Sequence, residues 1–291
     1  MDSTAIGVLA GLVSSFCWAL TTLSVRELTH NVSAVVVNGL RTAIAAVLTL
    51  FIAVPFWTVY PPAPPRWSSL AFMGLSVMTG LAFGDAIFFE SVRRIGVARA
   101  MPIAMSFPLI STLLAALFLE EPLTFAIVGG TLLVIAGVGL VVTEKNGHYT
   151  VQRADRAGYL LAGATAICWG LTAVLVRPSL EDMDVLTASA VRLPFASLLM
   201  LLVIRGRAIG AIRELTPRLW LLILGAGVLS VGATLLFVTA ISLAGAGKTA
   251  SVSATSPLFA APLAALFLKE PLTLRLTLGT VVSAVGVWLL L

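Results

Sequence analysis

Ten apolar stretches, each long enough to cross the hydrocarbon core of a membrane, follow one another along almost the whole chain. About 20 predominantly apolar residues suffice for one crossing. A backbone in lipid must satisfy its own amide and carbonyl groups, so such stretches are expected to be helices and not the short alternating strands of a barrel. The expected spans cover residues 4–24, 33–54, 68–92, 97–119, 125–143, 157–176, 185–204, 218–241, 247–268 and 274–291. The sequence therefore predicts an all-α polytopic membrane protein with ten transmembrane helices.

The composition excludes an ordinary soluble protein. Only 11% of the residues are charged and 59% are hydrophobic, whereas about a quarter of the residues in a soluble domain carry a charge. The net charge of +5 does not indicate a nucleic-acid partner, because the basic residues are scattered over short loops instead of forming one stripe. We expect the lipid bilayer as the main partner, and a multi-pass location in the cell (plasma or inner) membrane.

The chain also contains an internal repeat. AALFLEEPLT at 115–124 returns as AALFLKEPLT at 264–273, and FCWALT at 16–21 corresponds to ICWGLT at 167–172. The sequence predicts a first five-helix repeat over residues 1–145, a connecting loop over 146–156 and a second five-helix repeat over 157–291.

Five spans is an odd number, so the second repeat must enter the membrane from the side opposite to the first. Inverted repeats of this kind face each other across a pseudo-two-fold axis in the membrane plane, with substrate near the midplane between them. We therefore expect a transporter that works by alternating access through a central cavity between the repeats. A monomer can supply both halves, because the repeat is internal.

Lysine and arginine in short loops predict the orientation of the helices. The loops after the odd-numbered spans hold thirteen basic residues, and the opposite loops hold only three, namely Arg66, Arg177 and Lys248. Taken literally, this bias places both termini outside the cytoplasm.

Several motifs together resemble one known family. They are the CWxLT pattern at 17–21 and 168–172, an arginine in each second span, and the run GDAIFFESVRRIGVARAMPIAMSFPLISTLLAALFLEEPLT at 84–124. With the doubled set of five spans, they resemble the EamA group of the drug/metabolite transporter superfamily over essentially the whole chain. The resemblance implies a secondary transporter, often an exporter of amino acids or related metabolites. It also implies cytoplasmic termini, in conflict with the charge bias. The proton-exchanging glutamate in the first helix of small multidrug members has no counterpart in spans 1 and 6 of this chain.

Asp85 is the sharpest candidate for a functional residue, because an ionisable side chain at the centre of a membrane helix costs about 2.5–3.5 kcal/mol. It shares a helical face with Phe88 and Phe89. A carboxylate beside aromatic rings suits a substrate ammonium group, or a proton that couples transport. The alternative is a structural ion pair with Arg41, which we expect at the same depth.

Arg41 and Arg192 are the other charges well inside predicted spans, at equivalent positions of the two repeats. Each is a candidate to hold a substrate carboxylate or to close a gate; the alternative is a long side chain that reaches toward the lipid headgroups. Glu90 is a further candidate for coupling, but arginines three and four residues later favour an ordinary pair on the helix surface.

Trp18 and Trp169 occupy equivalent mid-span positions and are candidates to wall a cavity for a flat or apolar substrate, with helix packing as the alternative. Prolines in the fourth and ninth spans are expected to kink these helices and free backbone carbonyls, near serines that could meet substrate. They are Pro102, Pro108, Pro257 and Pro262, with Ser106 and Ser256. The repeated glutamates, Glu121 and Glu270, are expected to stabilise the N-termini of the fifth and tenth helices.

No catalytic arrangement, metal-ligand spacing or cofactor motif is found in the sequence. Asp85 is the single aspartate inside a span, and both histidines fall in loops, which argues against an intramembrane enzyme. We therefore predict a secondary transporter that exports small amphipathic metabolites, with bulky or aromatic amino acids as first choice. A transporter of drugs, of cationic compounds or of nucleotide-sugar-like metabolites, and a membrane scaffold that transports nothing, remain the alternatives.

Overall fold

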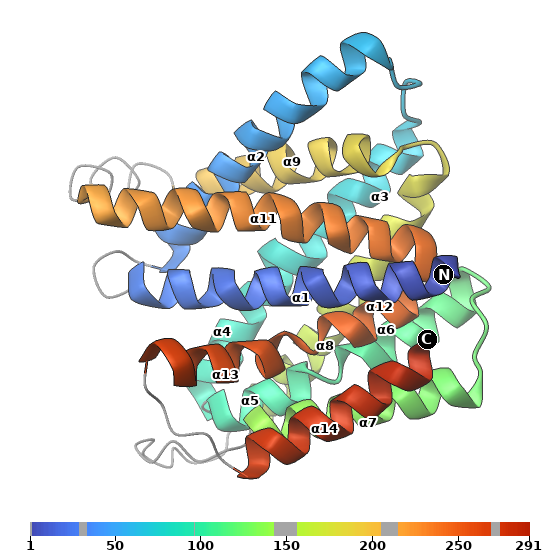
Figure 1. Ribbon diagram of the computed structural model, residues 1–291, viewed down its shortest axis with the longest axis vertical. Helices are drawn as coiled ribbons and strands as arrows, with labels where there is room; N and C mark the ends of the chain where they lie inside the picture. The colour runs from blue at the N-terminus through green and yellow to red at the C-terminus, as the bar shows by residue number, and fades with distance from the viewer. Residues whose placement is uncertain (1, 29–33, 96, 143–155, 205–214, 269–273) are drawn as a thin grey trace.

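The computed structural model describes residues 2–28, 34–95, 97–142, 156–204, 215–268 and 274–291 (Figure 1). All regular secondary structure in these ranges is helical, and each of the ten predicted spans corresponds to a helix or to a set of consecutive helices. Within the described residues, six helical stretches are long and apolar enough to cross a membrane, judged by length and composition. The prediction of an all-helical protein built from ten spans is confirmed.

The first repeat contains five spans, two of which are interrupted. α1 (Ser3–Leu28) and α2 (Ala34–Val59) are continuous, whereas the third span is divided into α3, a π-helical segment η1, and α4. Their bounds are α3 (Trp67–Val77), η1 (Met78–Gly84) and α4 (Asp85–Ile95), followed by α5 (Val97–Ala104), α6 (Phe107–Phe118) and α7 (Phe125–Val142).

The second repeat follows the same plan without a described π-helical segment. Its bounds are α8 (Arg156–Val176), the 3₁₀ segment η2 (Arg177–Glu181), α9 (Val185–Ile204), α11 (Pro217–Ala244), α12 (Ala246–Ser253), α13 (Ser256–Leu268) and α14 (Leu274–Leu290). The fourth and ninth spans are thus each made of two helices in sequence.

The breaks in the fourth and ninth spans lie at equivalent places in the two repeats. The amide of Ser106 donates to the carbonyl of Ile103 at 3.1 Å, and the amide of Thr255 donates to that of Val252 at 3.0 Å, so the same tight turn interrupts both spans. The next helix has a proline at its second position in each case, Pro108 in α6 and Pro257 in α13, where a missing amide costs little. α5 and α13 continue through Pro102 and Pro262.

The two repeats pack on each other in a symmetric way. α1 lies along α11, and the equivalent helix α8 lies along α3, η1 and α4. α2 packs on its own counterpart α9, and α7 on its counterpart α14. In Figure 1 the N- and C-termini lie at the same side of the molecule, as an even number of crossings requires. We call this side the termini face.

Glycines bring α7 and α14 into backbone contact. A Cβ atom at Gly130 would lie 2.7 Å from the carbonyl oxygen of Gly286, and a Cβ at Gly286 would lie equally close to that of Gly130. The hydroxyl of Ser283 donates to the carbonyl of Val134 at 3.2 Å in the same contact. Small residues of this kind drive helix association in membranes, where lipid removes the hydrophobic gain between helices.

We expect Gly130→Leu to weaken the α7–α14 contact, because the new side chain would collide with backbone atoms of Gly286. Its control is Gly129→Leu, since a Cβ at Gly129 meets nothing within 4 Å. Unfolding in mixed micelles should report a loss of about 1–3 kcal/mol for Gly130→Leu and little change for the control. Equal stabilities of the two variants would contradict this account of the contact.

Candidate functional site

The site begins at an irregular stretch of the third span. The π-helical segment η1 ends at Gly84, directly before Asp85. A Cβ atom at Gly84 would lie 2.7 Å from Cδ1 of Trp169, and one at Gly80 would lie 2.9 Å from Oγ1 of Thr172. Both glycines therefore allow α8 to approach the backbone closely. Short π-helical segments inside α-helices are rare and occur frequently at functional sites.

Asp85 and Trp169 are held together by a hydrogen bond between the repeats. The indole Nε1–H of Trp169 donates to Oδ1 of Asp85 at 3.1 Å. The same indole packs against Phe88, with ring centroids 5.1 Å apart, and meets Phe107 edge-on at 6.2 Å. Phenylalanines of α4 and α6 therefore pack on the indole of α8 that binds this carboxylate.

Arg41 is bound by neutral groups. Its Nε and Nη2 donate to Oδ1 of Asn38 at 2.9 and 2.6 Å, and its Nη1 donates to Oγ of Ser230 in α11 at 2.7 Å. The guanidinium carbon lies 5.1 Å from the ring centroid of Trp18 in α1, within the range of a cation–π interaction. The residue is only 8% exposed, so the side chain does not extend to the lipid headgroups.

Arg192 repeats this arrangement in the second repeat. Its Nη1 donates to the hydroxyl of Ser76 in α3, and its guanidinium carbon lies 6.0 Å from the ring centroid of Phe237 in α11. Each arginine thus donates to a serine of the other repeat and lies beside an aromatic ring. Because α2 and α9 enter the bundle from opposite sides, the two guanidinium groups belong to opposite halves of the span.

Asp85, Arg41 and Arg192 form no ion pairs with one another in the described structure. Between described residues, no ion pair within 4 Å joins Arg41 or Arg192 to a carboxylate, and Glu90 instead pairs with Arg94 at 2.7 Å. The structural pair between Arg41 and Asp85 that the sequence left open is therefore not formed, although the two charges interact electrostatically. Asp85 and Arg41 both retain capacity for a charged ligand.

The described hydrogen bonds of Asp85, Arg41 and Arg192 do not include Ser106 or Ser256. The hydroxyl of Ser106 donates back to the carbonyl of Ile103 at 2.6 Å, and Ser256 is the half-buried first residue of α13. The side chains of Phe89 and Pro102 lie outside the described part of the structure.

Four partners of the charged groups escaped the sequence analysis. Asn38 had a local signal, since it precedes Arg41 by one helical turn. Ser76, Ser230 and Phe237 had none, because only the packing of separate spans brings them to the arginines.

The role that the sequence predicts for Glu121 is wrong. We expected it to stabilise the N-terminus of α7, but its carboxylate accepts hydrogen bonds from the amides of Ala246 and Gly247 in α12. The hydroxyl of Thr124 accepts from the amide of Ile127 at 3.2 Å and so caps α7 in its place. Glu270 lies outside the described residues.

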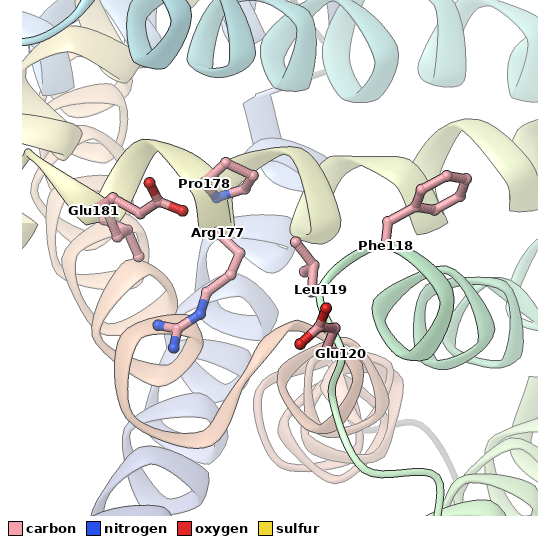
Figure 2. A pocket seen from close by; sticks show the side chains of 7 residues that line it. Phe118, Leu119, Glu120, Arg177, Pro178 and Glu181 are labelled. Atoms are coloured by element: carbon pink, nitrogen blue, oxygen red, sulfur yellow. The ribbon is translucent and has the colours of Figure 1, made fainter.

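A hollow of about 450 Å³ opens at the termini face, away from the buried charges (Figure 2). The end of α6 and the segment η2 supply its walls, and none of the predicted site residues lines it. The lining residues are Phe118, Leu119, Glu120, Arg177, Pro178, Leu180 and Glu181.

Comparisons with known proteins agree with this architecture. A profile of the "EamA-like transporter family" matches residues 5–143 and again residues 156–291. The chain is 27% identical over 286 residues to an "Uncharacterized transporter" of Archaeoglobus fulgidus, covering 98% of this chain and 97% of that protein. It is 31% identical over 146 residues to the "Uncharacterized transporter YvbV" of Bacillus subtilis, covering 49% of this chain and 46% of that protein.

One solved structure supports the fold. It is described as "Crystal structure of protein", has a TM-score of 0.79 and 18% sequence identity, and covers 99% of this chain and 96% of that one. At this level of identity the likeness speaks for the fold alone.

The hydrogen bond between Trp169 and Asp85 should appear as an energetic coupling. In a double-mutant cycle with Trp169→Phe and Asp85→Asn, we expect a coupling of about 0.6–1.7 kcal/mol, the range of polar contacts measured between membrane helices. The matched cycle with Trp18→Phe and Asp85→Asn should give a coupling near zero, because Trp18 contacts Arg41 instead. Reversible unfolding in mixed micelles measures both, and indistinguishable couplings would count against the contact.

Proposed function

This chain belongs to the EamA-like transporter family, and from that premise we propose that it exports small amphipathic metabolites, with bulky or aromatic amino acids as its main substrates. It is a multi-pass membrane transporter and not an enzyme. The proposal concerns the substrate, the residues that bind the substrate, and the direction of transport.

The observation that carries the proposal is the pair of unneutralised charges in the membrane-spanning part. Arg41 and Asp85 have opposite charge, interact electrostatically and form no ion pair with each other. An amino acid carries both complementary charges. Its carboxylate can accept from the planar donors of Arg41, and its ammonium group can bind Asp85 beside the indole of Trp169. A ligand with both groups would compensate two costly charges at once.

The aromatic rings support a bulky substrate. Trp18 and Trp169 come from equivalent helices of the two repeats, and each lies beside one of the two charged groups. Phe88 and Phe107 extend the aromatic surface next to Trp169. A large apolar side chain would find more contact area here than a small polar one.

The mechanism that we propose is alternating access between two five-helix repeats, residues 1–145 and 157–291, joined by 146–156. The broken fourth and ninth spans are the proposed moving elements, because each is interrupted at the same place by a turn that already lacks continuous helical hydrogen bonding. Asp85 is also the proposed site of proton coupling, since protonation would remove its charge and release a bound ammonium group.

We propose the cell membrane as the location, with both termini outside the cytoplasm, as the basic residues of the loops suggest. A reporter fused after Leu291 should therefore be accessible to membrane-impermeant reagents in intact cells. Accessibility only after permeabilisation would reverse the orientation and leave the fold untouched.

Transport by purified protein in liposomes tests the substrate. Vesicles loaded with a radiolabelled aromatic amino acid should lose it faster with the wild-type protein than with Asp85→Asn or Arg41→Gln. We expect at least about a tenfold loss of rate, since removing one partner of a desolvated charge pair costs about 2–5 kcal/mol. Glu181→Gln is the control, because Glu181 is an exposed carboxylate that lines the hollow at the termini face.

Substrate analogues test which group of the substrate binds to Asp85 and which binds to Arg41. An amino-acid amide keeps the ammonium group and lacks the carboxylate, so its transport should depend on Asp85 and no longer on Arg41. Transport of cations alone, with no effect of the carboxylate, would favour the cationic-compound alternative. Failure of every amino acid and related metabolite in this assay would contradict the proposal.

A further inference from the structure

The turn after the fourth span places the carboxylate of Glu121 against the second repeat. Glu120, two residues after the end of α6, has φ 55°, in the left-handed region. The next residue, Glu121, accepts from the amide of Ala246 at 2.6 Å through Oε1 and from that of Gly247 at 3.1 Å through Oε2. These amides are the free donors at the N-terminus of α12, so one carboxylate of the first repeat binds the ninth span of the second.

Glycines make room for this carboxylate. Gly245 has φ 89°, and a Cβ atom there would lie 2.8 Å from all three atoms of the Glu121 carboxyl group. A Cβ at Gly247 would lie 3.4 Å from Oε2. The segment that joins α11 to α12 is therefore shaped to receive Glu121.

The side chain of Arg177 binds the other end of this junction between α11 and α12, at the C-terminus of α11. Nη1 of Arg177 donates to the carbonyl of Ser242 at 3.0 Å and to that of Ile241 at 3.4 Å, at the C-terminus of α11. Figure 2 shows this side chain pointing toward the ribbon of the second repeat. Anions at helix N-termini and cations at C-termini are both favourable. Arg177 belongs to the same repeat as the junction, whereas Glu121 belongs to the other.

The contact lies on the termini face, and the residues that donate the two amides, Ala246 and Gly247, are buried. A Cβ at Gly7, near the start of α1, would lie 2.8 Å from Ala244 at the end of α11, which places the junction beside the N-terminal helix. Ala246 is fully buried, and Thr112 in α6 is 6% exposed. A Cβ at Gly247 would lie 3.1 Å from Cα of Thr112, so α6 and α12 meet without space for water between them.

We propose that Glu121 is a gating residue that holds the transport pathway closed at the termini face by binding the N-terminus of α12. We call this contact the α12 latch. It rests on the proposed alternating access, in which the repeats separate at one face at a time. The hydrogen bonds of Arg177 stay within the second repeat during such a motion, whereas both hydrogen bonds of Glu121 must break.

Cysteine accessibility tests the latch without any substrate. Thr112 is a suitable reporter position, because its hydroxyl is buried with no hydrogen-bond partner among the described residues, and a cysteine of similar size would disturb little. In a Cys17→Ser/Cys168→Ser/Thr112→Cys background, a water-soluble maleimide should label the new thiol slowly. Glu121→Gln should accelerate labelling about fivefold to thirtyfold, the factor that corresponds to losing one helix cap. The neighbouring exposed Glu120 supplies the matched control, Glu120→Gln.

Gly245→Ala is the second variant. Its methyl group would displace the carboxylate, so labelling should accelerate as in Glu121→Gln, and the double variant should label no faster than the faster single variant. If Glu121→Gln fails to yield folded protein on gel filtration, Glu121→Asp retains the charge but withdraws it from the amides. Labelling of all these variants at the rate of the Glu120→Gln control would overturn the latch.

Transport measurements distinguish a failure of the α12 latch from a failure of the proposed substrate. Accelerated labelling together with no amino-acid transport by wild-type protein would keep the latch and refute the substrate. Amino-acid transport with unchanged labelling would keep the substrate and refute the latch. If both hold, Glu121→Gln should lower the transport rate while binding of the substrate, measured in detergent, persists, because the closed state is lost and the binding residues are not.

Discussion

A charge inside a membrane must be solvated by the protein itself, and the arrangement of this molecule follows from that constraint. Arg41 and Arg192 are not balanced by carboxylates of the described residues; neutral hydroxyl and amide oxygens accept their hydrogen bonds. In both cases the serine that accepts comes from the other repeat. The same bonds that make the guanidinium groups tolerable therefore hold the repeats together, in a register where each arginine lies beside an aromatic ring.

The irregular segments of the bundle occur where polar groups gather. The π-helical segment η1 ends beside Asp85, and the breaks between α5 and α6 and between α12 and α13 interrupt the two spans that meet at the centre of the repeat interface. Backbone that departs from α-helical geometry in a membrane needs partners within the protein. The interface between the repeats supplies such contacts, since η1 packs on α8 and α12 packs on α6.

The two repeats have the same arrangement of helices, but they differ in the polar residues at equivalent positions. Asp85 of the first repeat aligns with Thr234 of the second, which is buried and uncharged. Trp169 donates to Asp85, whereas its counterpart Trp18 lies under Arg41. The two repeats therefore share a buried arginine, Arg41 in the first and Arg192 in the second, but only the first has a carboxylate at the position of Asp85.

The amino-acid sequence by itself determined the helical class, the ten spans and the duplication, because apolar length, backbone hydrogen bonding in lipid and repeated motifs are all local properties of the chain. It also singled out Asp85, Arg41, Arg192 and the two tryptophans, since a charge or a mid-span indole is unusual wherever it occurs. Only the tertiary structure decided which of them meet. Asp85 turned out to be bound to Trp169 and not to Arg41, and Glu121 to α12 and not to its own helix. Such pairings depend on crossing angles and on glycines that let backbones approach, and these quantities are set by helices far apart in the sequence.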